Sequence, residues 1–170
     1  MSEAAVRRSP IVIREVRPEE FDTLGEITVD AYREVGEIDT AYFPELRDVA
    51  GRAAQVPVLV ATEKGSGAVL GGVTYVPGPG PFHEGEFREA ASFRMLAVSA
   101  AARGRGVGRA LVEACIERAR AERRPAIGIY TRPFMAAAHR LYRSLGFRRL
   151  PALDWEFMPG EWLWAYRLDL

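Results

Sequence analysis

The chain carries the stretch Arg103-Gly104-Arg105-Gly106-Val107-Gly108-Arg109 between an apolar run, residues 93–98, and a helical pattern over residues 108–123. The first N–H groups of a helix lack partners within the helix and carry the positive end of its dipole. Glycines let an anion approach this part of the main chain, and arginines add charge-assisted hydrogen bonds. The stretch therefore predicts a phosphate-binding turn at the head of a helix.

The spacing of these glycines excludes two common phosphate sites. The stretch does not match G-x-x-x-x-G-K-[ST], so the lysine and magnesium-binding hydroxyl of a nucleoside triphosphatase are missing. The glycines fall as G-x-G-x-G, and no acidic residue ends a following strand about 20 residues further on. A dinucleotide-binding site is therefore not expected either.

Two motifs resemble those of the GNAT superfamily, the N-acyltransferases that use acyl-CoA. Arg103-x-x-Gly106-x-Gly108 is similar to the family pattern [Q/R]-x-x-G-x-[G/A]. Residues 138–147 resemble a second pattern, A-x-x-L-Y-x-x-x-G-F, in which Tyr142 is the tyrosine. The resemblance extends over residues 11–168 and implies an α/β GNAT fold, with a mixed central sheet whose parallel strands splay apart at the acyl-CoA site.

The resemblance also implies a reaction and its residues. Acetyl-CoA is the expected cofactor, and direct transfer to a primary amine, carried by a small molecule or a peptide, is the expected reaction. Backbone groups of the cofactor strand would bind pantetheine, and the glycine loop would bind pyrophosphate. The implied cofactor-binding residues are Leu96, Ala97, Val98, Arg103, Gly104, Arg105, Gly106, Val107, Gly108 and Arg109.

Tyr142 is the implied catalytic residue, which would protonate the departing thiolate. A phenol suits this task because its ordinary pKa of about 10 keeps it protonated at neutral pH. The same residue lies on the apolar face of a predicted helix, so a core aromatic is the alternative interpretation. Gly146 is expected to end this helix with a positive φ.

The chain departs from the family pattern where an asparagine and a glutamate are common. Met135 stands at the asparagine position, and Tyr130 and Ser92 stand at the two glutamate positions. No general base is assigned as a result. The candidates are acids before the cofactor strand and in the loop after the first helix, and each can equally be a solvated surface acid: Glu86, Glu89, Glu37 and Asp39.

The apolar periodicity predicts alternating strands and helices. Strands are expected at residues 11–16, 58–62, 69–76, 93–98, 126–131, 147–150 and 162–168. Helices are expected from residue 18 onward and at residues 42–54, 108–123 and 133–145. The strands at 58–62 and 69–76 should form a hairpin, and those at 93–98 and 126–131 should pair in parallel.

Composition indicates one domain over residues 11–170, preceded by a mobile tail at residues 1–10. No apolar run approaches the roughly 20 residues of a membrane span, and no secretory signal is recognised, so a cytoplasmic protein is expected, from a high-GC bacterial source. Cys115, the only cysteine, is expected to be a buried apolar filler. His83 and His139 are expected at the surface, and no metal site is predicted.

The formal net charge is zero, but its distribution is uneven. Arginines dominate residues 103–149 and acids dominate residues 15–48. The basic half suits an anionic cofactor, and the acidic half, around Glu34, Glu37 and Asp39, suits a cationic acceptor or is simply solvated surface. A nucleic-acid partner is not expected, because the balance is neutral and no basic stripe carries interleaved aromatics.

The aromatic residues near the C-terminus have two interpretations: strand packing, or an apolar wall of the acceptor pocket at Trp155-Glu156-Phe157-Met158. Two alternatives to catalysis also stay open. These are a non-catalytic acyl-CoA sensor and an interaction domain without a ligand. The resemblance leaves a homodimer open as well.

Overall fold

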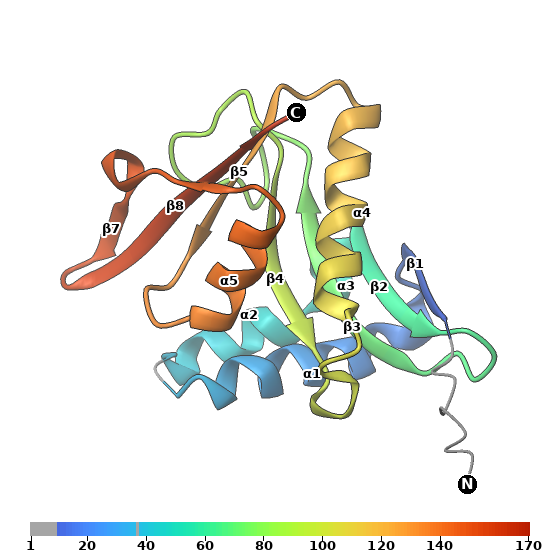
Figure 1. Cartoon of the computed structure of the whole chain (residues 1–170). Coiled ribbons are helices and arrows are strands. Elements are labelled where there is room, and N and C mark those ends of the chain that lie inside the picture. Colours follow the sequence, from blue (N-terminus) through green and yellow to red (C-terminus); the bar gives the residue numbers. More distant parts are fainter. Residues whose placement is uncertain (1–9, 37) are drawn as a thin grey trace, which may run out of the picture.

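The computed structural model describes residues 10–36 and 38–170, whose strands form two sheets (Figure 1). The first sheet has the order β1-β2-β3-β4, with antiparallel neighbours: β1 (Ile11–Glu15), β2 (Val58–Glu63), β3 (Val69–Val76) and β4 (Ser92–Val98). The second has the order β5-β8-β6, with β7 paired to β8: β5 (Ala126–Thr131), β6 (Arg148–Arg149), β7 (Trp155–Met158) and β8 (Glu161–Asp169). The predicted hairpin of β2 and β3 is confirmed.

A parallel bridge between Ala91 and Ile127 joins the two sheets. The Ala91 N–H donates to the Ala126 carbonyl at 3.0 Å, and the Gly128 N–H donates to the Ala91 carbonyl at 2.9 Å. The strands β4 and β5 are not paired with each other beyond this point in the described residues. The prediction of parallel pairing along both strands is therefore wrong in extent, while the expected splay is confirmed.

The described residues contain α-helices and short 3-10 turns. The α-helices are α1 (Phe21–Glu34), α2 (Phe43–Arg47), α3 (Val49–Ala53), α4 (Val107–Ala121) and α5 (Ala136–Ser144). The 3-10 turns are η1 (Pro18–Glu20), η2 (Thr40–Tyr42), η3 (Ala100–Ala102) and η4 (Pro151–Leu153).

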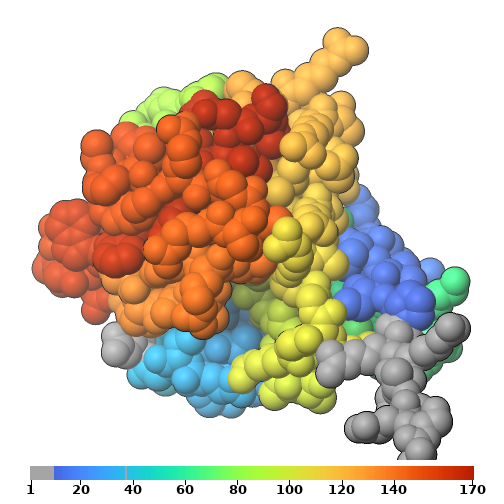
Figure 2. Space-filling view, viewed as in Figure 1, coloured from blue at the N-terminus to red at the C-terminus, as the bar shows by residue number. Residues whose placement is uncertain are grey.

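Two glycines of β3 let α1 and α4 cover opposite faces of the first sheet. A Cβ at Gly72 would lie 2.6 Å from Leu24 Cδ1 of α1, and a Cβ at Gly71 would lie 3.3 Å from Val107 Cγ1 of α4. Because adjacent residues of a strand face opposite sides, the two helices pack on either face of β3. In the space-filling view, α4 in yellow flanks the C-terminal residues in orange and red (Figure 2).

The predicted helix at residues 42–54 is divided at Asp48, so this prediction is wrong in its continuity. Asp48 has a ψ of 67°, which no helix accommodates, and its carboxylate accepts the Gly51 N–H at 2.9 Å to cap α3. Arg52 stabilises the break, because its guanidinium donates to the carbonyls of Glu45 and Leu46 at 2.6 and 3.1 Å.

Helix α5 begins at Ala136, three residues after the predicted start at residue 133. The preceding residues form a turn in which the Met135 N–H donates to the Arg132 carbonyl at 3.1 Å. The helix ends as predicted: Gly146 has a φ of 91°, and the Phe147 N–H donates back to the Tyr142 carbonyl at 3.0 Å.

The main hydrophobic core lies between the first sheet and α4 and includes Cys115, which is fully buried as predicted. Burial raises the pKa of the Cys115 thiol. His139 is only 4% exposed and stacks on Trp164 with ring centroids 5.3 Å apart, so the prediction of a surface position was wrong. None of the helices described is long and apolar enough to span a membrane.

Candidate active site

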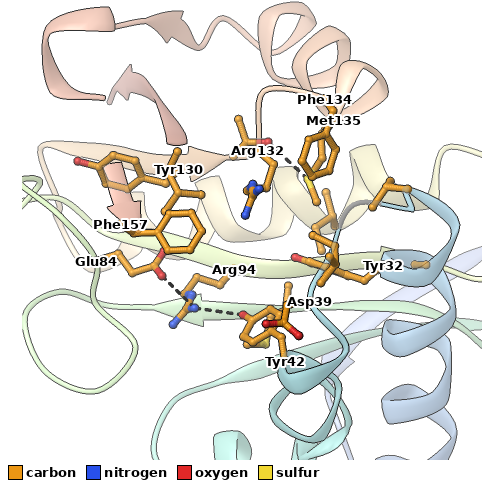
Figure 3. A pocket seen from close by; sticks show the side chains of 18 of the residues that line it. Tyr32, Asp39, Tyr42, Glu84, Arg94, Tyr130, Arg132, Phe134, Met135 and Phe157 are labelled. Atoms are coloured by element: carbon orange, nitrogen blue, oxygen red, sulfur yellow. Dashed lines mark hydrogen bonds and ion pairs between the residues drawn. The ribbon is translucent and has the colours of Figure 1, made fainter. Parts of the chain in front are cut away.

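A cavity of about 810 Å³ opens where β4 and β5 separate (Figure 3). Its walls come from β4 and the end of β5, from the end of α1 through η2, from the loop at Glu84, from the turn before α5 and α5 itself, and from β7 and β8. The volume lies within the range of small-molecule sites, about 300–1,000 Å³. The splay of the two strands therefore provides room for a ligand.

A β-bulge at Met95 shapes the β4 wall. Arg94 stands opposite Thr74 and Ala97 opposite Gly72, so Met95 and Leu96 share one partner residue on β3. Met95 takes a φ of 55°, which is uncommon for a residue with a side chain. Leu96 lines the cavity.

The C-terminal end of β4 leaves backbone groups on its open edge. The Ser99 N–H donates to the Leu70 carbonyl of β3 at 2.8 Å. Because the backbone groups of an antiparallel strand alternate in direction, those of Ala97 also face β3, and those of Val98 face the open edge. Of the predicted pantetheine-binding residues, Leu96 and Val98 therefore lie where a ligand could extend the sheet, and Ala97 does not.

The glycine loop has the backbone conformation of an anion-binding turn. Gly104 and Gly106 have φ values of 73° and 80°, and a Cβ at either position would meet no atom within 4 Å. Gly106 is the N-cap of α4, so the N–H groups of the first turn, which lack partners within the helix, follow it directly in the chain. These features fit a pyrophosphate group.

Carboxylates accompany the three arginines of this loop. Arg103 pairs with Glu34 at the end of α1, Arg105 pairs with Glu63 at 3.0 Å, and Arg109 pairs with Glu113 at 3.0 Å. A bound pyrophosphate would compete with these acids for the guanidinium groups. Glu34 lies beside the glycine loop and does not line the cavity. This position differs from the expectation that the acids around Glu34 receive a cationic acceptor.

Tyr142 of α5 lines the cavity and is 6% exposed. Its ring packs against Phe93, Phe147 and Tyr166, with centroids 5.7, 5.8 and 6.1 Å away. Within the described residues its hydroxyl makes no hydrogen bond, and burial raises its pKa, so the phenol stays protonated. Tyr142 thus packs in the core and also borders the cavity.

The four acids proposed as the base lie in different places. Asp39 lines the cavity, where its carboxylate accepts the Ala41 N–H at 2.9 Å. Glu89 is exposed and pairs with Arg167 at 2.9 Å, which lowers its pKa. Glu86 is not among the lining residues, and Glu37 falls outside the described residues.

A fifth acid, Glu84, was missed by the sequence interpretation. Its side chain lines the cavity and pairs with Arg94 at 3.0 Å, and Arg94 also donates to the Tyr42 hydroxyl at 3.2 Å (Figure 3). Burial raises the pKa of Glu84, although the Arg94 guanidinium acts in the opposite direction. The only sequence signal was its position in the loop before β4, which Glu86 and Glu89 share.

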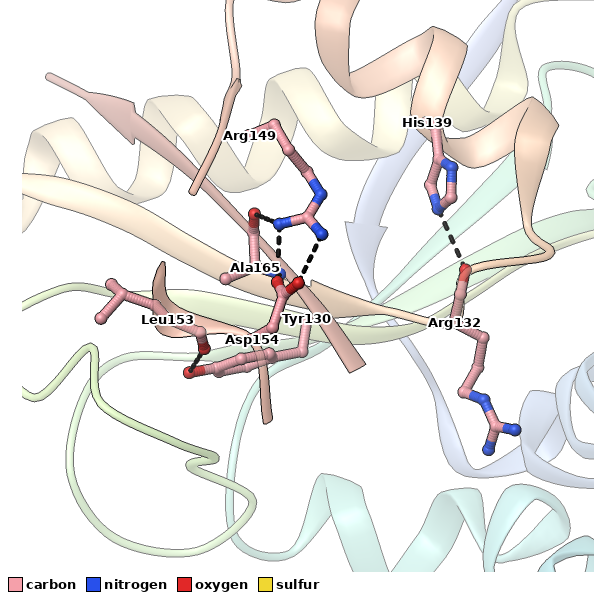
Figure 4. Close-up of polar contacts among 7 residues, drawn as sticks. All are labelled: Tyr130, Arg132, His139, Arg149, Leu153, Asp154 and Ala165. Atoms are coloured by element: carbon pink, nitrogen blue, oxygen red, sulfur yellow. Dashed lines mark hydrogen bonds and ion pairs between the residues drawn. The ribbon is translucent and has the colours of Figure 1, made fainter. Parts of the chain in front are cut away.

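Tyr130, at one of the family's glutamate positions, holds two loops beside the cavity (Figure 4). Its hydroxyl donates to the Leu153 carbonyl at 3.2 Å and accepts the Glu86 N–H at 3.3 Å. Asp154 next to Leu153 is fixed by a pair with Arg149 at 2.6 Å. These contacts position the loop from which Glu84 reaches the cavity and the turn that leads into β7.

The β7 strand forms an apolar wall, as one of the two interpretations of the C-terminal aromatics predicted. Trp155, Phe157 and Met158 all line the cavity. Met135, at the family's asparagine position, lines it too, and the Thr131 hydroxyl donates to its sulfur at 3.7 Å. A thioether therefore stands at the position where the family pattern has an amide.

Comparison with known proteins agrees with this architecture. The family model described as the acetyltransferase (GNAT) family matches residues 21–147. A GCN5-related N-acetyltransferase from Kribbella flavida is 29% identical, with 94% of this chain and 98% of that chain covered and a TM-score of 0.70. Among curated proteins no significant match was found.

Two further solved structures cover most of the chain. A ribosomal-protein-alanine N-acetyltransferase from Brucella melitensis is 27% identical, with 94% and 99% coverage and a TM-score of 0.64. The protein yncA from Salmonella typhimurium, assigned as an acetyltransferase and solved with its cofactor acetyl-CoA, is 26% identical, with 94% coverage of both chains and a TM-score of 0.66. The fold and site thus define an acyl-group transferase. The chain belongs to the GNAT family and is an acetyl-CoA-dependent N-acetyltransferase.

Proposed function

We propose that this protein transfers the acetyl group of acetyl-CoA directly to a primary amine bound in the cavity. The observation that carries the proposal is the cavity between β4 and β5, which is lined both by Leu96 of β4 and by Tyr142 of α5. The structure yncA, solved with acetyl-CoA, supports the choice of cofactor.

The cofactor would be held by the chain's own backbone and arginines. The free N–H groups at the start of α4, reached across Gly104 and Gly106, would bind the pyrophosphate, with Arg103, Arg105 and Arg109 adding charge. Backbone groups of Leu96 and Val98 on the open edge of β4 would bind the pantetheine amides. When bound, acetyl-CoA supplies a thioester whose acyl carbon an amine can attack.

We propose Glu84 as the group that accepts the proton of the acceptor amine, directly or through a water molecule. Glu84 is the more buried of the two carboxylates that line the cavity, and its raised pKa brings it closer to the working pH, as a general base requires. Asp39, the other lining acid, caps η2 and is exposed.

Tyr142 would give its proton to the departing sulfur. Burial raises the pKa of this hydroxyl, which weakens it as an acid. The same apolar wall raises the basicity of a thiolate buried beside it, so proton transfer between the two stays feasible. An N–H group of β4 would polarise the thioester carbonyl.

Thiol release from acetyl-CoA in the presence of an amine panel tests this proposal. The panel should contain small amines, amino acids and a short peptide. Turnover of at least one amine is expected. Binding of CoA without thiol release from any amine would overturn the proposal and favour an acyl-CoA sensor.

Several sequence expectations stay predictions. These are a single domain over residues 11–170, a cytoplasmic location and a homodimer. The tail predicted for residues 1–10 lies, apart from Pro10, outside the described residues.

A further inference from the structure

The guanidinium of Arg132 lies at the wall of the cavity (Figure 3), and none of the functions above uses it. Its side chain is only 17% exposed. Two contacts fix the residue. The Met135 N–H donates to its carbonyl oxygen at 3.1 Å, and His139 Nε2 lies 3.0 Å from the same oxygen (Figure 4). Because burial lowers the pKa of His139, its neutral ring can donate this bond at neutral pH.

Two aromatic rings hold the Arg132 guanidinium in one orientation. Its central carbon lies 5.0 Å from the ring centre of Phe134 and 5.1 Å from that of Phe157, and both rings line the cavity. The N–H donors of a guanidinium lie in its plane, so rings over its face leave them able to donate hydrogen bonds at its edge. The orientation therefore favours an acceptor that meets the edge of the guanidinium.

The edge of Arg132 has donor capacity left over. One terminal nitrogen pairs with Glu161 of β8, whose side chain is 46% exposed and is not among the lining residues. The Nε–H is buried and has no hydrogen-bond partner within the described residues. A buried donor without an acceptor is costly, so a small movement of the guanidinium that brings this N–H to a ligand's acceptor would be favourable.

Arg132 is paired with Glu161 outside the cavity lining, and neither acid that lines the cavity, Asp39 or Glu84, forms an ion pair with it within the described residues. Arg94 is already paired with Glu84, and Asp39 comes from the α1–η2 segment on the opposite side of the cavity (Figure 3). A planar carboxylate matches the in-plane fork of a guanidinium. The aromatic rings beside it suit an apolar or aromatic body.

We propose that the acceptor is an amine that also carries a carboxylate, such as an amino acid with an apolar or aromatic side chain, and that Arg132 binds this carboxylate. This inference rests on the proposed acetyl transfer. The amine would then lie toward Leu96 and Tyr142. The proposal differs from the sequence expectation of a cationic acceptor, which rested on the acidic residues 15–48.

A binding experiment without an amine tests the Arg132 site independently of catalysis. Calorimetry in saturating CoA would compare 3-phenylpropionate with 3-phenylpropionamide, which differ only in the anionic group. The carboxylate should bind at least about tenfold more tightly. Arg132→Met should abolish this preference, and Arg148→Met, which removes an exposed pair with Asp169, should preserve it. Equal binding of the two probes, or an unchanged preference in Arg132→Met, would overturn the site.

Kinetics would then connect the site to the reaction. L-phenylalanine, L-phenylalaninamide and 2-phenylethylamine would be compared by kcat/KM, corrected for the fraction of neutral amine. The amino acid should be preferred, Arg132→Met should remove the preference, and Glu161→Gln should keep or increase it, because this variant frees Arg132 from a competing acid. Preference for 2-phenylethylamine would overturn the proposal. If calorimetry shows a preference for the carboxylate but no amine is acetylated, the proposed function is refuted and the Arg132 binding site is still supported.

Discussion

Arg103 of the glycine loop is paired with Glu34 at the end of α1, which links the candidate pyrophosphate site to the helix that leads into the cavity wall. Both side chains are about half exposed, at 53% and 47%. The pair therefore competes with an anionic ligand for Arg103, but solvent limits its strength.

Removal of this competitor should strengthen cofactor binding. Glu34→Gln is expected to lower the Kd of CoA by up to about fivefold at low ionic strength, with a smaller effect at high salt, because exposed ion pairs are weak and screened. Calorimetry at two salt concentrations measures it. Glu117→Gln, which breaks an exposed pair with Arg120 further along α4, is the matched control. Weaker CoA binding in Glu34→Gln would show that Glu34 does not compete with the ligand.

A side chain at Gly106 should obstruct the pyrophosphate. Gly106→Val is expected to weaken CoA binding by at least about tenfold, because the side chain would occupy the open space in front of the α4 N-terminus. Positive φ at this position also strains the backbone, so the control is Gly160→Val, at a φ of 77° against 80°, again with no atom near the added Cβ. Similar losses of thermal stability are expected in both variants. A normal CoA affinity in folded Gly106→Val would refute the loop assignment.

The Tyr142 hydroxyl should affect turnover more than stability. Tyr142→Phe keeps the ring contacts with Phe93 and Phe147 and removes a hydroxyl that bonds no described residue, so thermal stability and CoA affinity should change little. The value of kcat should fall by roughly 10²-fold or more, as for the loss of a general acid. Thiol-release kinetics together with thermal unfolding measure both. Full turnover in Tyr142→Phe would show that Tyr142 serves only as a core aromatic.

The pH dependence of kcat/KM should reveal the ionisation of Glu84. A base acts only when deprotonated, so kcat/KM should rise with pH through the pKa of Glu84, and burial shifts this limb above the ordinary range of glutamate. Glu84→Gln should lower kcat/KM by about 10²-fold or more and remove the limb. Glu86→Gln, in the same loop but not among the lining residues, is the control and should keep the wild-type profile. An unchanged profile in Glu84→Gln would exclude Glu84 as the base.

Local patterns in the sequence were enough for most elements. The periods of apolar residues predicted the long helices and the strands other than β7, and the glycine after α5 predicted the positive φ at Gly146. The family motifs fall on the glycine loop and on α5. The break at Asp48 was not predicted, because it depends on the Asp48 side chain capping the following helix and on Arg52 binding the freed carbonyls.

Which polar side chains meet in the cavity depends on the tertiary structure. Glu84 faces Arg94 because its loop is held by Tyr130 and Leu153, which lie far along the chain, and Arg132 gains its orientation from Phe157 on another strand. The spacing of residues in the sequence predicts which side chains are neighbours within one helix or strand, because the backbone geometry there is regular. It cannot report which side chains meet across a cavity, because those contacts depend on how separate elements pack and on where β4 and β5 part.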